Sequence, residues 1–293
     1  MKSTSDPPAD ASNETAHLAS PSAMSLVVIA LVGVLFWNNY DWLVHEWRYD
    51  PYYSHGLLIP IISGYLIYRK RDRLRALPQK QFIGGIFVIV LSLCLHFAAT
   101  YVDVNFVSSF ALVGVLLGLA WWLYGRPVIK ELAFPLAFLV FMIPLGRLLI
   151  DRVAQPMQLF AAQVAGAGAQ LLGMPTEIDG TTLRIPDYTF EVAVACSGLK
   201  SAIAMLALGA LLAYVVKGVW WKKVVIFASA LPVAMLANAA RIWVTMMLGR
   251  ALSEKAAEGF FHTFSGLLVF LLAFIGLFGV TNLLKCKQLR DDI

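Results

Sequence analysis

The stretch DYTFEVAVACSGLKSAIAMLALGALLAYVV, residues 187–216, changes its hydrophobic period part-way along. Apolar and polar residues alternate up to Ala195, which predicts a short strand, and from Leu199 a continuous apolar run predicts a membrane-spanning helix. Cys196 therefore lies where an extended segment turns into a helix. Free backbone N–H groups and the helix dipole at such a place favour a thiolate over a thiol, so Cys196 is a candidate nucleophile. The alternative is a small buried cysteine in a membrane helix.

The composition excludes an ordinary soluble domain. Of the 293 residues, 59% are hydrophobic and 14% are charged, whereas about a quarter of the residues of a soluble domain are charged. The net charge of +5 reflects membrane topology rather than nucleic-acid binding, because the basic residues cluster in short loops between apolar runs. The topology predicted below places Cys94 in or near the outer half of a span and Cys286 on the cytoplasmic side, and no CxxC or HxxxH spacing occurs. We therefore expect no disulfide framework, no metal site and no cofactor.

The apolar runs predict an all-α polytopic membrane protein with about eight transmembrane helices. The runs cover residues 24–42, 55–68, 82–99, 106–124, 132–150, 199–216, 224–248 and 264–284. Residues 1–23 are polar and are predicted to form a flexible cytoplasmic tail, residues 24–284 the transmembrane domain, and residues 285–293 a short cytoplasmic tail.

The distribution of lysine and arginine predicts the orientation. With the N-terminus inside, the cytoplasmic segments hold 15 of the 23 basic residues, including the loop RKRDRLRALPQK at residues 69–80. The positive-inside rule then places both termini in the cytoplasm. Counting residues 153–173 as a ninth span would move the basic segments KGVWWKK and KCKQLR outside, so we predict that they do not span.

Between the fifth and sixth spans, residues 151–195 form a longer segment, predicted to be extracytoplasmic. Its first part is rich in Ala, Gly and Gln and predicts an interfacial or re-entrant helix. Its second part alternates on both sides of Asp179-Gly180, a turn pair that predicts a β-hairpin.

Three reactive side chains then fall at one depth, near the outer membrane surface. Cys196 begins the sixth span, Arg241 lies in the outer part of the seventh, and His262 stands at the outer start of the eighth. A thiol, a guanidinium and an imidazole are what cysteine acyl transfer needs: a nucleophile, a group that stabilises negative charge, and an acid–base. Taken singly, Arg241 also fits a snorkelling side chain and His262 an interfacial histidine.

Four further residues are supporting candidates. Asn238 precedes Arg241 on the same helical face, where it either serves the site or bonds across helices. Ser197 is expected to cap the helix that starts at Leu199. Glu191 is expected to orient His262 or Arg241 or to contact substrate, and otherwise to be a solvated charge. His55, at the outer start of a span, is either a partner of the site or structural.

The motifs EVAVACSG at 191–198, NAAR at 238–241 and HTFSG at 262–266 resemble the signatures of the exosortase/archaeosortase family, and YYSHGLLIPIISGYLIYRKR at 52–71 resembles its first block. The resemblance covers the chain from about Trp42 to Leu284. It implies a membrane-embedded cysteine protease/transpeptidase with Cys196 as nucleophile, Arg241 supporting the transition state and His262 as acid–base.

The resemblance also implies partners and a location. Substrates would be secreted proteins with a C-terminal sorting tail: a short motif such as Pro-Glu-Pro, a transmembrane helix and a basic end. The acceptor of the cleaved protein is open between water, an amine and an exopolysaccharide or other envelope glycan. The expected location is the inner membrane, with the active site on the extracytoplasmic side. Because the sequence ends nine residues after the last predicted span, we expect no additional C-terminal domain of the kind some exosortases carry.

The rival interpretation is a non-catalytic transporter or scaffold for exopolysaccharide assembly or export. In a transporter Arg241 and His262 would line a pathway, and in a scaffold Cys196 would be passive. The span centres are almost uniformly apolar, which disfavours a charged pathway.

Overall fold

The computed structural model describes residues 23–186, 188–251, 260–286 and 288–291, and the side chains of some helical residues within these ranges are outside the description. The chain divides into two compact units, residues 1–38 and 39–293. The described part of the first unit, residues 23–38, contains α1 (Ala23–Leu35). Helix α2 (Trp37–Tyr49) begins in the first unit and continues in the second, which holds all later elements.

The structure is mainly helical, with apolar helices typical of a membrane protein. Three described helices are long and apolar enough to cross a membrane, or four if the bent pair 27–35 and 37–49 counts as one span. Shorter apolar helices lie at residues 58–69, 199–215 and 268–283. Most of the apolar runs therefore become helices, while the total of eight spans stays a prediction.

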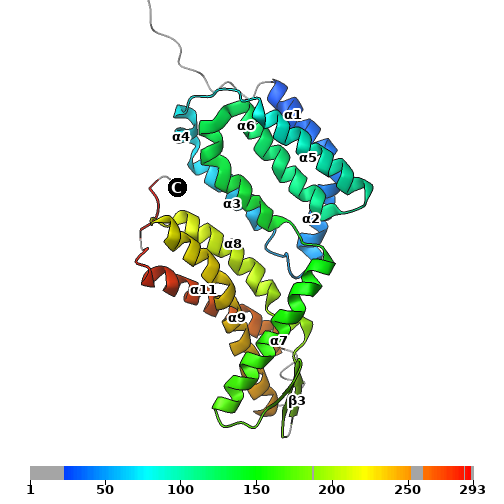
Figure 1. Ribbon diagram of the computed structural model, residues 1–293, viewed down its shortest axis with the longest axis vertical. Coiled ribbons are helices and arrows are strands. Elements are labelled where there is room, and N and C mark those ends of the chain that lie inside the picture. The colour runs from blue at the N-terminus through cyan, green and yellow to red at the C-terminus, as the bar shows by residue number, and fades with distance from the viewer. Residues whose placement is uncertain (1–22, 187, 252–259, 287, 292–293) are drawn as a thin grey trace, which may run out of the picture. The chain divides into compact units, whose positions relative to one another are not determined.

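The N-terminal half of the second unit is built around a helical hairpin. It contains α3 (Leu58–Arg69), α4 (Arg71–Ala76), α5 (Gly84–Tyr101), α6 (Asn105–Phe138) and the 3₁₀ turn η1 (Leu139–Met142). Helix α5 packs along α6 (Figure 1). A Cβ on Gly85 would lie 2.4 Å from the backbone nitrogen of Trp122, so the glycine permits the closest approach between these two helices.

Helix α6 is broken at Gly125. This residue has φ 79° and ψ −173°, a region that is almost closed to residues with a side chain. A Cβ there would also lie 2.1 Å from the carbonyl oxygen of Lys80. The break separates the apolar arm before Gly125 from the arm that ends at Phe138.

We expect Gly125→Ala to destabilise the protein, because the alanine is strained in this conformation and collides with a backbone carbonyl. The cost should be about 2 kcal/mol or more of unfolding free energy, read as a lower thermal unfolding midpoint in detergent. Gly64→Ala is the matched control, since Gly64 lies inside α3 with open space around its Cα. Equal midpoints for the two variants would contradict the argument.

The predicted fifth span, residues 132–150, is not one helix. The helix ends at Phe138, η1 follows, and a new helix, α7 (Arg147–Leu171), begins after a short non-helical link. The link contains Pro144 and Gly146. Proline removes a backbone donor and turns the preceding residue away from helix, so the apolar run is interrupted although its hydrophobicity continues.

A small antiparallel sheet packs on α7. Its strands are β1 (Glu177–Asp179), β2 (Thr182–Ile185) and β3 (Tyr188–Glu191), in the order β1-β2-β3. Strands β1 and β2 flank the Asp179-Gly180 turn, and β3 lies in the alternating stretch before Cys196, ending at Glu191 and not at Ala195. Small residues of α7 let the sheet approach: a Cβ on Gly166 would meet the side chain of Ile178 at 2.6 Å.

The remaining helices complete the core around the candidate nucleophile. They are α8 (Leu199–Val215), α9 (Trp220–Ala251) and α11 (Phe260–Leu283), with the 3₁₀ turn η2 (Val194–Cys196) before α8. Helix α8 lies along α9 (Figure 1). The close contact is made by small side chains, since a Cβ on Gly209 would lie 2.8 Å from the Cβ of Ala230.

The chain after α11 is fastened to the far end of α8. Val216 and Leu289 form an antiparallel bridge, and the backbone N–H of Arg290 donates to the carbonyl of Val215 at 2.8 Å. Lys217 also pairs with Asp291, with Nζ and Oδ2 2.5 Å apart. Helix α8 is thus bounded by the candidate nucleophile at one end and this bridge at the other.

Candidate active site

Cys196 is the last residue of the turn η2, two residues before helix α8 is entered through Gly198. Gly198 is the N-cap of the helix and has φ +81°, a left-handed conformation that suits glycine. Ser197 is therefore not the N-cap that the sequence predicted, although its Oγ lies 3.4 Å from the backbone nitrogen of Leu199 and accepts that N–H. The sequence Cys-Ser-Gly therefore sets a sharp turn that places the cysteine directly before a helix N-terminus.

Asn238 of α9 holds this turn from the side. Its Nδ2 donates to the carbonyl oxygen of Cys196 at 2.7 Å, and the side chain is 1% exposed. A Cβ on Gly198 would lie 2.8 Å from Cγ of Asn238, so the amide fits only where residue 198 has no side chain. The Oδ1 atom of Asn238 is buried without a hydrogen-bond partner among the described residues.

The thiol of Cys196 lies in an apolar layer between α7, the sheet and α9. It is 7% exposed and belongs to a buried cluster with residues such as Ala165, Leu183 and Ile242. Burial raises the pKa of the Cys196 thiol, and the positive charge of Arg241 opposes this by lowering it, with burial the larger effect. The net direction is therefore opposite to what the helix N-terminus alone predicts, and the resting form is the thiol.

Arg241 lies on α9 three residues after Asn238 and is half-buried. Its charge acts on Cys196, so the structure brings Cys196, Asn238 and Arg241 into one neighbourhood. His262 is in the first turn of α11, but its side chain lies outside the described part of the chain. Glu191 is an exposed residue at the end of β3, paired across the sheet with Thr182.

His55 lies just before α3, beside the start of α8. Its ring stacks on Tyr53 with 6.1 Å between the ring centroids, and its Nε2 is buried without a hydrogen-bond partner among the described residues. Burial, with a smaller contribution from the charge of Lys200, lowers the pKa of His55. Lys200 is in the first turn of α8, four residues after Cys196. His55 is therefore a neutral imidazole at pH 7, near the nucleophile's helix.

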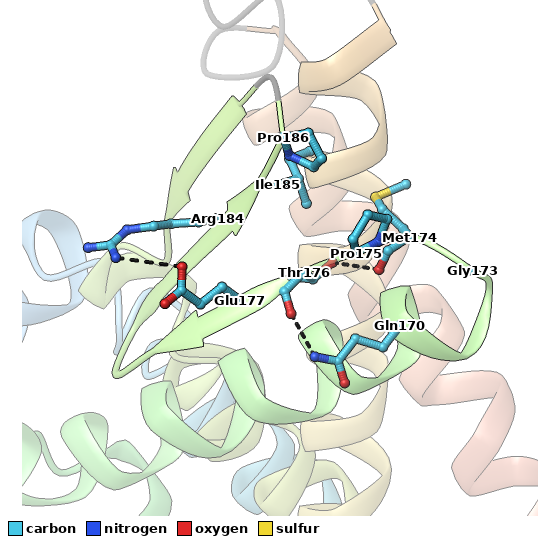
Figure 2. Close-up of a pocket in the computed structure, with 9 residues that line it drawn as sticks. All are labelled: Gln170, Gly173, Met174, Pro175, Thr176, Glu177, Arg184, Ile185 and Pro186. Carbon is cyan, nitrogen blue, oxygen red and sulfur yellow. Dashed lines mark hydrogen bonds and ion pairs between the residues drawn. The ribbon is translucent and has the colours of Figure 1, made fainter.

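An open pocket of about 930 Å³ lies between the C-terminal end of α7 and the sheet (Figure 2). Its apolar lining includes Met174 and Ile185, and both of these side chains pack against the cluster that contains Cys196. At its rim Arg184 pairs with Glu177, with Nη1 and Oε2 3.8 Å apart (Figure 2). One shared layer of side chains therefore connects the pocket with the cysteine.

A family model described as "Transmembrane exosortase (Exosortase_EpsH)" matches residues 47–279. The chain belongs to the transmembrane exosortase family. The match spans Cys196, Arg241 and His262, and it also includes His55. Exosortase membership indicates a membrane-embedded sorting protease or transpeptidase, a class that is generally of the cysteine type. Searches of curated proteins and of solved structures found no match.

Sequence reasoning missed one buried polar residue of this exosortase domain. Gln158 of α7 is 8% exposed, and its Nε2 donates to the carbonyl of Val192, four residues before Cys196. The backbone N–H of Val192 donates in turn to the carbonyl of Thr181 at 2.9 Å. The signal in the sequence was a glutamine within an Ala-rich helix, where a polar group needs a partner. Gln158 and Asn238 thus hold residues 192–198, the loop of the candidate nucleophile (below, the nucleophile loop), from two helices.

Because burial raises the pKa of the Cys196 thiol, we expect the rate of its alkylation to depend on pH. In a Cys94→Ser/Cys286→Ser background, the rate of reaction of Cys196 with iodoacetamide should rise with pH with a midpoint above that of an ordinary cysteine. Because the Arg241 charge lowers the pKa, Arg241→Gln should move the midpoint to still higher pH and slow alkylation at pH 8 by about threefold or more. Arg48→Gln, at an exposed position on α2, is the control. A midpoint that Arg241→Gln leaves unchanged would contradict the assignment of Arg241 as the neighbour that lowers the thiol pKa.

Proposed function

We propose that this chain is a membrane-embedded cysteine peptidase/transpeptidase that removes the C-terminal sorting tails of exported proteins through a thioester on Cys196. The observation that carries the proposal is the nucleophile loop. Cys196 precedes a helix N-terminus, its carbonyl is held by Asn238, and the charge of Arg241 acts on its sulfur. Both the loop and the arginine belong to motifs within the exosortase match.

The reaction begins with removal of the thiol proton, because burial keeps Cys196 protonated. The thiolate then attacks the scissile carbonyl, and the resulting oxyanion is stabilised by Arg241. When the C–N bond breaks, the amine of the departing tail takes up the proton, and the protein remains as a thioester on sulfur. An acceptor nucleophile attacks the thioester carbonyl, the C–S bond breaks, and the acceptor's proton restores the thiol.

We assign the acid–base role to His262 and a supporting role to His55. Both are imidazoles, and His262 lies in the first turn of α11, which packs along α9, the helix of Arg241. The Nε2 of His55 is buried without a hydrogen-bond partner among the described residues, so it is available for a hydrogen bond to substrate or to another residue of the site. Glu191, exposed near the loop, is assigned to substrate contact.

The pocket beside the sheet is the proposed docking site for the sorting motif. A short Pro-containing segment is extended, and the apolar lining and the edge strand β1 suit such a chain. An acidic side chain in a Pro-Glu-Pro motif would compete with Glu177 for Arg184 at the rim. The substrate's own tail helix would diffuse in the inner membrane and present the motif on the extracytoplasmic side, with both termini of the enzyme cytoplasmic.

The test is co-expression of the chain with a secreted reporter that ends in a Pro-Glu-Pro motif, a transmembrane helix and a basic end. The expected result is a shortened reporter in cells with the wild-type chain and a full-length, membrane-bound reporter in cells without it. Mass measurement of the new C-terminus identifies the cleaved bond. Equal shortening of the reporter in cells with and without the chain would contradict the proposal and favour a transporter or scaffold.

A further inference from the structure

The three-stranded sheet β1–β3 contributes to the buried layer around the Cys196 sulfur, together with α7 and α9. The layer consists of apolar side chains from these elements and from the stretch after β3: Ala161, Ala162, Ala165, Ala169, Leu183, Ile185, Val192, Ile242 and Met246. Leu183 and Val192 are fully buried, and Cys196 is 7% exposed. Nucleophilic attack requires about 3–3.5 Å between the sulfur and the substrate carbonyl. An extended substrate chain therefore reaches the sulfur only if part of this layer moves.

The sheet is anchored to α7 at its two ends. Before β1, Gln170 Nε2 donates to the carbonyl of Thr176 at 2.6 Å (Figure 2). After β3, Gln158 Nε2 donates to the carbonyl of Val192. In the described part of the chain, the ion pairs of β1 and β2 stay within the sheet, and these strands meet α7 through apolar side chains. The sheet can therefore turn about its two anchored ends while both hydrogen bonds to α7 are kept.

The face of α7 beneath the sheet carries small side chains. It presents alanines and Gly166, and a Cβ on Gly166 would lie 2.6 Å from Cδ1 of Ile178 and 3.1 Å from Cδ2 of Leu183. Alanine and glycine have no long side chain that could interlock with Ile178 and Leu183. Lifting the sheet from α7 thus breaks dispersion contacts, each of which is weak.

Two buried polar atoms of α9 lack a hydrogen-bond partner among the residues that the structure describes. They are Oδ1 of Asn238, the residue that holds the Cys196 carbonyl, and Nε1 of Trp243, whose ring packs against the layer around the sulfur. A buried polar atom without a partner raises the free energy of the arrangement that buries it. When the layer opens, water or the substrate backbone can pair with such atoms, so the closed arrangement is poised to open.

We propose that the sheet β1–β3 is a lid, which covers the Cys196 thiol at rest and lifts from α7 by turning about Thr176 and Val192 before each cleavage; this rests on the proposed function. The closed lid keeps the thiol away from water and from the carbonyl groups of other proteins. Gly173, in the link before Thr176, has φ +79° and open space around it, so the backbone there can adjust as the lid turns.

The pocket assigned to the sorting motif lies beside the Thr176 end of this lid. Thr176 itself lines the pocket, and two further lining residues, Met174 and Ile185, also pack in or against the layer around the sulfur. A motif that fills the pocket therefore touches side chains that keep the lid closed. Docking of a tail and exposure of the thiol are in this way coupled.

A disulfide between α7 and β1 tests whether the lid must lift. The pair is Gly166→Cys/Ile178→Cys in a Cys94→Ser/Cys286→Ser background. A Cβ at residue 166 would lie 2.7 Å from Cγ1 of Ile178, which is one bond from its Cβ, so the two Cβ atoms fall near the separation of about 3.5–4.5 Å that a disulfide joins. Copper phenanthroline closes this clamp and dithiothreitol opens it. The thermal unfolding midpoint of the closed form should be no lower than that of the reduced form.

Closing the clamp should slow the reaction of Cys196 with iodoacetamide by about tenfold or more, because the thiol is alkylated through openings of the layer. The measurement is mass spectrometry of the peptide that contains Cys196. Cleavage of a tailed reporter should fall by at least the same factor and return on reduction. The matched control is Val216→Cys/Leu289→Cys in the same background, a disulfide at the bridge beyond the far end of α8. It should leave both rates within about twofold.

The outcomes separate the lid from the proposed function. Unchanged alkylation with the clamp closed would overturn the inference even if cleavage falls, because the sheet would then not cover the thiol. Unchanged cleavage would overturn it too, since the reaction would proceed with the lid closed. Failure of the two cysteines to join under oxidant would contradict the resting position of the sheet on α7, with the same result. An absence of cleavage in every variant, the unclamped background included, counts against the proposed function, and the alkylation rates then decide between a lid and a fixed sheet.

Discussion

Replacing Cys196 by alanine is expected to stop cleavage of a tailed reporter, with the rate falling by about 10³-fold or more. The expectation follows from the proposed mechanism, in which the thioester forms on the Cys196 sulfur, and neither of the other two cysteines lies beside it. The measurement is the fraction of reporter shortened at fixed times in membranes that contain equal amounts of each enzyme. Cys196→Ser should also lose most activity, since a hydroxyl is the weaker nucleophile at neutral pH.

The chain supplies its own matched controls for this substitution. Cys286 is buried at 4% exposure and Cys94 is exposed. Cys94→Ser and Cys286→Ser should each leave the cleavage rate within about twofold, as is usual for substitutions outside an active site. Full activity of Cys196→Ala would reject cysteine catalysis, whatever the effect of the other variants.

The second large effect is expected from Gly198→Ala, which should lower the cleavage rate by about 100-fold or more, the size of loss that a misplaced reacting group causes. An alanine at φ +81° is strained, and its Cβ would lie 2.8 Å from Cγ of Asn238. Relief of this contact would move the amide that holds the carbonyl of Cys196. The nucleophile would then be displaced while the helices keep their packing, so turnover should fall more than thermal stability.

A double variant separates the backbone strain of an alanine at residue 198 from the collision of its Cβ with Asn238. Asn238→Ala removes the group that the new Cβ would strike, so Gly198→Ala/Asn238→Ala should lose less activity than the sum of the two single losses, expressed as activation free energies. Gly180→Ala, in the turn between β1 and β2, is the reference for backbone strain alone, since Gly180 has φ +60° and open space around it. Strictly additive losses in the double variant would show that residues 198 and 238 do not constrain each other.

The sequence predicted those parts of the candidate site where a reactive side chain lies at a local change of secondary structure or on one helical face. The change of period at Cys196 located the turn before α8, and the spacing of Asn238 and Arg241 located a polar face of α9 that lies against that turn. The protonation state of the Cys196 thiol could not be predicted from the sequence in the same way. A helix N-terminus is visible in a sequence, but the apolar cluster that buries the sulfur is assembled from α7, the sheet and α9.

Two further features depended on packing over long distances in the chain. The apolar run after Leu132 reads as continuous, and only the proline and glycine of the link before α7 mark where it breaks. Gln158 has no motif of its own, and its partner, the carbonyl of Val192, lies 34 residues away. Contacts of this kind arise from the pairing of α7 with the nucleophile loop, which hydrophobic periodicity alone does not specify.

In the proposed enzyme, helix α8 separates the Cys196 sulfur from the C-terminal bridge between Val216 and Leu289. Its 17 residues, at 1.5 Å each, span about 26 Å, slightly less than the hydrocarbon core of a bilayer at about 30 Å. As the sixth span predicted from the sequence, α8 would set the height of the Cys196 sulfur above the opposite membrane surface, where Lys217 and the C-terminal bridge would lie. A tail helix of matching length would bring its scissile bond to that height, and a longer one would carry it past. Bilayer thickness would in this way become part of substrate choice, so the same tail would be processed at different rates in membranes of different thickness.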